Sequence, residues 1–113
     1  MSSEIEDFQE QLDSLIKGVQ QVLDKEIPRL KGRERQDKCA YLKNRLVRAR
    51  QVYRSIIVEI RDLDPEEAES WRARADTYDA RLAKLSQDVE WAETAIDKDA
   101  VAAQEGKARF TYL

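Results

Sequence analysis

Few residues of this chain belong to the types that usually catalyse reactions or bind metals. The 113 residues include no histidine and one cysteine, Cys39. A catalytic histidine, a zinc site of histidine and cysteine, and an internal disulfide are therefore excluded. Carboxylates are abundant, but Glu66, Glu67 and Glu69 lie within four residues after Pro65. Carboxylates in the first turn of a helix interact favourably with the positive end of the helix dipole, so we interpret these three as helix-stabilising residues and not as a catalytic acid–base pair.

Other catalytic and cofactor-binding motifs are also missing from the sequence. There is no glycine-rich phosphate loop and no Glu-x-x-His pattern of the kind found in di-iron bundles. Cys39 falls on an apolar helical seam, so we expect it to be a small core residue and not a nucleophile. We therefore predict that the protein is not an enzyme and that it uses no metal and no cofactor.

The charges are divided into three blocks along the chain. Residues 1–27 carry a net charge of −5, residues 31–61 carry +7, and residues 62–105 carry −8. The whole chain is acidic, with a net charge of −3, which opposes a general affinity for nucleic acid. We interpret the division as complementarity between neighbouring helices that fixes their order.

Three segments, residues 3–28, 34–62 and 65–98, repeat apolar residues every three or four positions. This spacing predicts one apolar stripe on each of three helices. The period is near 3.5, which favours coiled-coil-like packing. The predicted seams are Ile5, Phe8, Leu12, Leu15, Val19 and Val22; Cys39, Leu42, Leu46, Ala49, Tyr53, Ile56, Ile60 and Leu63; and Ala68, Trp71, Ala75, Tyr78, Leu82, Leu85, Val89, Ala92 and Ile96.

Two breaks in the pattern predict how the helices are connected. Pro28 and Gly32 should end the first helix, because proline lacks a donor and disfavours helix at the residue before it. Asp64 and Pro65 combine an N-cap residue with a good first helical residue, so a new helix should begin there. We predict an all-α, antiparallel up-down-up three-helix bundle over residues 1–98, with left-handed coiled-coil-like packing.

A small set of apolar and polar residues lies outside the seams. Val47 and Val58 are eleven positions apart on the outward side of the second helix, with Gln51 and Arg54 between them. Trp91 stands one position before the seam of the third helix. Exposed aromatic and arginine side chains often anchor protein partners, so we predict these five residues as a partner-binding surface.

No segment of the chain predicts export or membrane insertion. The start, MSSEIEDF, is acidic where a signal peptide would be basic and then apolar, and the longest aliphatic run covers only residues 56–58. We therefore expect this fragment to be soluble, without direct membrane insertion. A monomer is favoured, although the sequence leaves the oligomeric state open.

The stretch from the second helix into the third resembles the N-terminal Habc domain of Vti-type SNAREs, the Qb class of vesicle transport v-SNAREs. The first helix, which contains IEDFQEQLDSLI, also looks like that family. The residues that carry the resemblance are Glu59, Ile60, Arg61, Pro65, Trp71, Arg72, Arg74, Tyr78, Leu82 and Leu85.

The resemblance implies a function in traffic between Golgi and endosomes. It implies recognition by ENTH-type adaptor proteins or a role in regulating SNARE assembly and membrane fusion, on the cytoplasmic face of Golgi, endosomal or vesicle membranes. Pairing with other SNAREs would use a C-terminal SNARE motif that this chain does not include. Residues 99–113 would then be a helix extension or a linker toward that motif.

Two alternatives remain open at this point. One is a syntaxin-type Habc domain, which folds back on its own SNARE motif and inhibits it. The other is a spectrin-like structural repeat, although such repeats usually carry a tryptophan in the first helix and residues 12–23 contain none.

Overall fold

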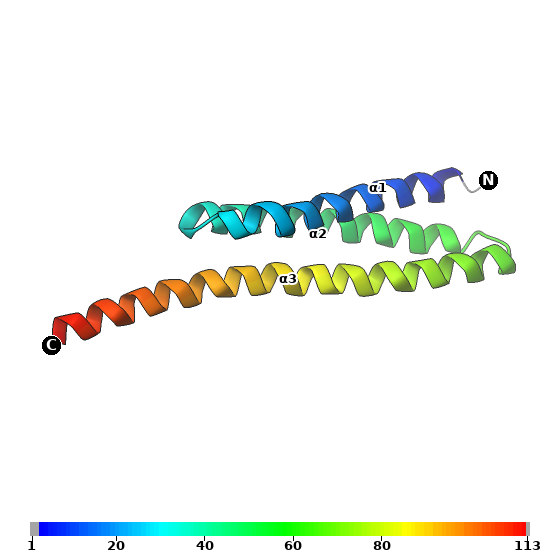
Figure 1. The fold of residues 1–113 in the computed structure, drawn as a ribbon. Coiled ribbons are helices and arrows are strands. Elements are labelled where there is room, and N and C mark those ends of the chain that lie inside the picture. Colours follow the sequence, from blue (N-terminus) through cyan, green and yellow to red (C-terminus); the bar gives the residue numbers. More distant parts are fainter. Residues whose placement is uncertain (1–2, 113) are drawn as a thin grey trace.

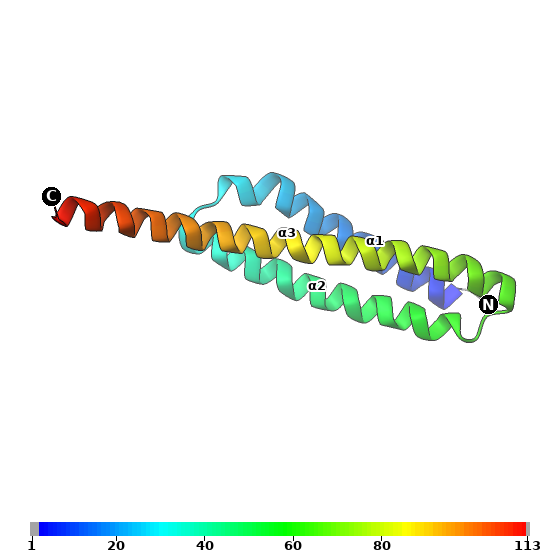
Figure 2. The same cartoon turned by 90° about the horizontal axis from the view of Figure 1, so that it is seen from below.

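The computed structural model describes residues 3–112, and the side chains of residues 4–95. Helix α1 spans Ser3–Gln21, α2 spans Gly32–Ile60 and α3 spans Pro65–Tyr112. The helices run up, down and up along a molecule of 72 × 18 × 17 Å, and the described residues contain no strand (Figure 1). The predicted all-α three-helix bundle is thus confirmed. Helix α3 is continuous to Tyr112 and extends past the corner between α1 and α2 (Figures 1 and 2).

The corner between α1 and α2 is built around Pro28. Regular α-helix ends at Gln21, and the chain continues as a π-helix, η1 (Val22–Glu26), and a 3-10 helix, η2 (Ile27–Arg29). A proline removes one backbone donor and its ring crowds the carbonyl four residues earlier, so the preceding turn widens. Gly32 then starts α2 with a φ of 59°, a left-handed conformation that glycine adopts at little cost.

The corner between α2 and α3 is a short turn that Asp64 caps. The Asp64 Oδ1 accepts the backbone N–H of Glu67 at 3.1 Å, and the Asp64 carbonyl accepts the N–H of Ala68 at 2.8 Å. Pro65 occupies the first helical position. The predicted N-cap is therefore confirmed, and it turns α3 back along α2.

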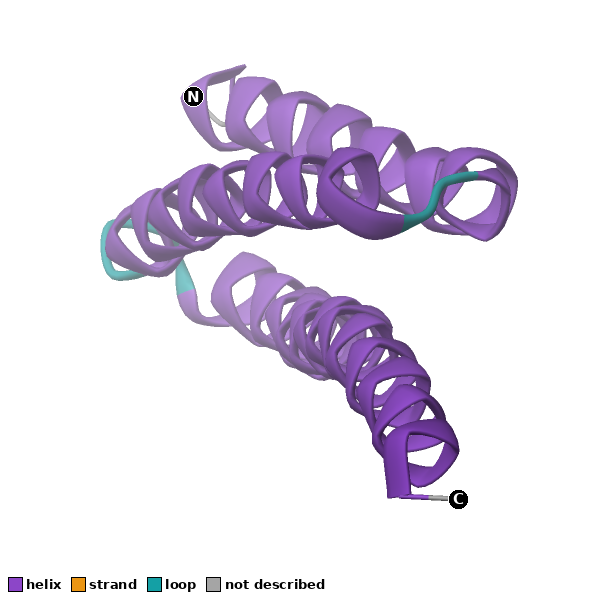
Figure 3. Ribbon diagram, turned by 90° about the vertical axis from the view of Figure 1, so that its left-hand side faces the viewer, coloured by secondary structure: helices purple, strands orange, loops and turns teal. Residues whose placement is uncertain are grey.

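Helix α2 lies between α1 and α3, and each of them contacts α2 far more than they contact each other (Figure 3). The seams form one continuous core. Val52, which lies outside the predicted seam, is buried, whereas its neighbour Tyr53 is half-buried. A helix with a neighbour on two sides buries a wider face than a single seam.

Of the predicted seam residues, Ile96 falls outside the described side chains. The buried residues are Ile5, Leu12, Leu15, Ile16, Val19, Ile27, Cys39, Leu42, Leu46, Ala49, Val52, Ile56, Ile60, Ala68, Trp71, Ala75, Leu82, Leu85, Val89 and Ala92.

A hydrogen bond links α1 directly to α3. The Tyr78 hydroxyl donates to the Asp13 Oδ1 at 2.6 Å. Burial of the ring raises the pKa of Tyr78, and the hydrogen bond to Asp13 raises it further. The tyrosine therefore stays a neutral donor, and it joins the two helices that share the least packing.

Candidate functional site

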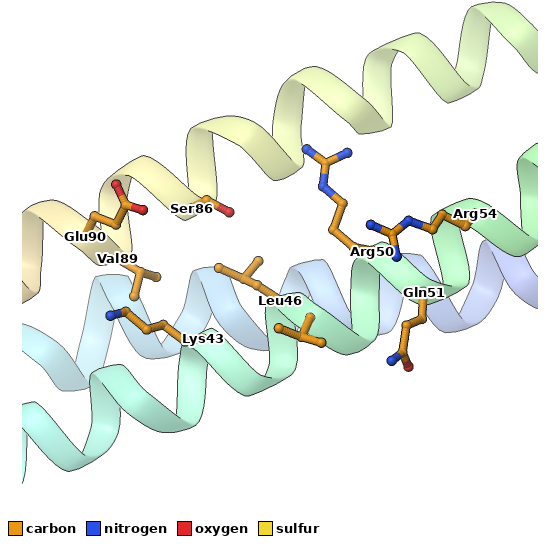
Figure 4. A pocket seen from close by; sticks show the side chains of 9 residues that line it. Lys43, Leu46, Arg50, Gln51, Arg54, Ser86, Val89 and Glu90 are labelled. Carbon is orange, nitrogen blue, oxygen red and sulfur yellow. The ribbon is translucent and has the colours of Figure 1, made fainter.

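A groove between α2 and α3 is the best candidate for a functional surface. It encloses a cavity of ≈ 460 Å³ and runs along the two helices (Figure 4). We call it the α2–α3 groove. It is lined by Lys43, Leu46, Val47, Arg50, Gln51 and Arg54 of α2 and by Ser86, Val89 and Glu90 of α3.

The floor of the groove is apolar. Leu46 and Val89 belong to the core, with exposed fractions of 5% and 1%. Val47 also lines the groove and is 58% exposed. A half-exposed valine above a packed floor offers apolar area that another molecule could cover.

Three cations form the α2 wall, and two of them are already held by α3. Arg50 Nη1 lies 2.5 Å from the Asp79 Oδ1, and Lys43 is paired with Glu93. The hydrogen bond to Glu93 raises the pKa of Lys43, so this side chain stays charged. In Figure 4, Arg50 extends from α2 toward α3.

Arg54 is the third cation of the wall, and its environment differs from that of the other two. It is exposed and makes no ion pair with the part of the chain that the structure describes. The opposite wall, from α3, carries the hydroxyl of Ser86 and the carboxylate of Glu90. The groove therefore has a basic side along α2 and a polar to acidic side along α3.

The structure brings together three of the five residues that the sequence predicted. Val47, Gln51 and Arg54 all line the α2–α3 groove. Val58 is 53% exposed but lies beyond the groove, and Trp91 is 68% exposed on α3 without lining it. Val58 and Trp91 are therefore not part of the groove lining.

Six of the lining residues follow a simple rule that the sequence reasoning missed. Lys43, Val47, Arg50 and Arg54 each come directly after a seam residue of α2, and Ser86 and Glu90 each come directly after a seam residue of α3. A one-residue step rotates a side chain by about 100° around its helix. In two antiparallel helices that rotation brings both sets of side chains to the same side of the contact. Trp91 directly precedes a seam residue, so it is turned the other way.

Two other hollows are less suited to binding a partner. One of ≈ 600 Å³ lies between α1 and α2, and its carboxylates Asp7 and Glu10 share the hollow with Arg45 and Arg48. Only Leu15 supplies it with a large apolar side chain. The other, of ≈ 400 Å³, lies between α1 and α3, and Ile16 is the one apolar residue among the described residues that line it. These hollows have less exposed apolar area to bury than the α2–α3 groove.

The structure gives no sign of a catalytic or metal-binding role for the reactive side chains that it describes. Cys39 is fully buried, and burial raises the pKa of its thiol, which disfavours the reactive thiolate. Among the described residues, no three His, Cys, Asp or Glu side chains gather closely enough to hold a metal ion. Within the same part of the chain, no helix is both long enough and apolar enough to span a membrane.

Comparison with known proteins gives one match. The family model for the N-terminus of vesicle transport v-SNARE proteins matches residues 1–93, which covers α1, α2 and most of the packed length of α3. No curated protein and no solved structure matches the chain significantly.

Proposed function

The chain belongs to the vesicle transport v-SNARE family, and we propose that it is the non-catalytic protein-interaction domain of such a SNARE. The family match places the chain in vesicle transport, and the family is one of non-enzymatic trafficking proteins. It also favours a SNARE domain over a spectrin-like structural repeat. The α2–α3 groove is the observation that carries the proposal, because it places at one surface an exposed valine and an arginine that makes no ion pair with the described residues.

In more detail, we propose a Vti-type Habc domain that ENTH-type adaptors recognise during transport between Golgi and endosomes. The sequence resemblance around the corner at Pro65 supports this class. The domain would then work on the cytoplasmic face of those membranes. The groove is open on the bundle surface, so a folded adaptor could reach it without any rearrangement of the three helices.

The proposal can be tested by direct binding. We expect purified ENTH domains to bind the 113-residue chain in isothermal titration calorimetry, and we expect binding to weaken in Val47→Asp. Val58→Asp is the matched control, since it places the same charge on the same helix outside the groove. Absence of binding across a panel of ENTH domains would contradict the adaptor proposal. Equal weakening in both variants would contradict the groove as the contact surface.

A further inference from the structure

The groove has a shape and charge pattern that specify its occupant more closely than the proposed function does. Its α2 lining runs from Lys43 to Arg54. Eleven steps at about 1.5 Å per residue give a length of about 16 Å, or three helical turns. A segment of three or more turns lying along the groove could therefore contact the whole lining.

A helix suits this surface better than an extended strand does. An extended segment exposes unpaired backbone donors and acceptors, and it gains affinity by adding to a sheet edge. The described residues contain no strand, so they offer no such edge. A helix satisfies its own backbone groups and needs only to bury an apolar stripe, which Val47 and the floor residues Leu46 and Val89 would cover.

The charges of the two walls determine how the edges of that helix should be charged. Lys43, Arg50 and Arg54 lie along α2, whereas Glu90 is the only ionised side chain that the described part of α3 contributes to the groove lining. Lys43 and Arg50 already neutralise carboxylates of α3. Arg54 is the cation that is left to pair with an incoming carboxylate.

Resting on the proposed function, we infer that the α2–α3 groove binds one amphipathic helix of a partner protein. The helix carries acidic side chains along the edge that faces α2. Its other edge, which faces Ser86 and Glu90, is uncharged or basic. A nucleic acid does not fit this surface, because phosphates would meet Glu90, its bases would find only aliphatic side chains on the floor, and the chain carries a net charge of −3.

Selection from a peptide library provides the test. The probe is a display library of helix-forming peptides of about 18 residues, with Leu fixed at positions i, i+3, i+4 and i+7 and with both edges randomised. This Leu spacing is the one by which amphipathic helices bind apolar grooves. The target is the intact 113-residue chain. We expect enriched peptides to carry Asp or Glu on one edge and to be depleted of both residues on the other.

The enriched peptides are then measured by fluorescence polarisation against four variants. Val47→Asp and Arg54→Glu should each weaken binding about tenfold or more, because each puts a negative charge opposite an acidic edge. Val58→Asp and Arg33→Glu make the same charge changes on α2 outside the groove and should leave affinity within about twofold. Circular dichroism confirms that each variant is folded, which is expected because all four side chains are exposed.

Three results would overturn the inference. They are failure to enrich any peptide, enrichment without an acidic edge, and binding that Val47→Asp and Arg54→Glu leave unchanged. These results are distinct from failure of the adaptor proposal. An ENTH domain that binds equally well to wild type and Val47→Asp would contradict this inference and the groove as the contact surface, while leaving recognition by an ENTH-type adaptor in place.

Discussion

The hydrogen bond between Tyr78 and Asp13 offers the sharpest test of how the bundle is held together. Helices α1 and α3 contact each other little, so this bond is a large part of what joins them directly. Tyr78→Phe keeps the half-buried ring and removes only the hydroxyl. A hydrogen bond to a charged partner contributes about 1.5–3 kcal/mol, and water around the exposed Asp13 reduces that figure. We expect Tyr78→Phe to lower the free energy of unfolding by about 1 kcal/mol.

The assay is urea and thermal unfolding followed by far-UV circular dichroism. A loss of about 1 kcal/mol lowers the midpoint temperature of a domain of this size by about 4–8 °C. Tyr53→Phe is the matched control. Its ring is also half-buried, but its hydroxyl has no hydrogen-bond partner in the described part of the chain. We expect less than about 0.5 kcal/mol of change there. Equal effects in the two variants, or no effect of Tyr78→Phe, would refute the role assigned to this bond.

The same bond predicts a dependence on pH. The folded-state pKa of Tyr78 lies above the ordinary value of 10.0, first because of burial and then because of the bond to Asp13. A raised folded-state pKa means that the stabilisation is fully present below pH 10 and is lost as the pH rises through the folded-state value. The difference in unfolding free energy between wild type and Tyr78→Phe should therefore be constant from pH 7 to about 9 and shrink above about 10. A difference that grows in alkali would contradict this sign.

Substitutions at three further positions test the corners and the helix interior by the same unfolding measurements. Gly18→Ala should raise stability by about 0.5–1 kcal/mol, because an added Cβ meets open space within a regular helix. Gly32→Ala should lower it by about 1–2 kcal/mol, because its φ of 59° disfavours any side chain although the surrounding space is also open. A shift of the same sign in both glycine variants would contradict the backbone argument. Asp64→Ala should cost about 1 kcal/mol through loss of the cap on the Glu67 N–H, whereas Asp64→Asn, which can still accept that bond, should cost less than half as much.

The fold was predictable because each local signal agrees with the others. Seam spacing identified the three helices, and the Asp64–Pro65 pair identified the start of α3. The π-helix before Pro28 was not predictable. A proline indicates that the preceding helical turn loses its regular hydrogen bonds, but it does not indicate whether that turn becomes a π-helix, a 3-10 helix or a loop. The burial of Val52 was missed for a related reason. A single seam describes contact with one neighbour, and α2 has a neighbour on each side.

The candidate site was predicted only in part, and the reason is geometric. Val47, Gln51 and Arg54 were found because they stand outside the seam of one helix. The α3 side of the groove needs the relation between two helices, which spacing along one helix does not contain. The predicted antiparallel order supplies that relation, because residues directly after each seam must then share one side of the contact. Applied to the sequence, this rule would have selected Ser86 and Glu90 and rejected Trp91.

The same rule explains why the charge division both stabilises the bundle and leaves a binding surface. Arg50 and Asp79, and likewise Lys43 and Glu93, directly follow seam residues on α2 and α3, and they form the ion pairs that the complementary charges predicted. Exposed pairs of this kind contribute little to stability because water and salt screen them, so they fix helix order more than they add stability. Arg54 stands at an equivalent position on α2, but it makes no ion pair with the described part of α3. A substitution that places a carboxylate of α3 beside Arg54 should therefore compete with the acidic helix for this arginine. The groove would lose its affinity for that helix while the bundle kept or gained stability, which separates the binding role of Arg54 from the structural role of its two neighbours.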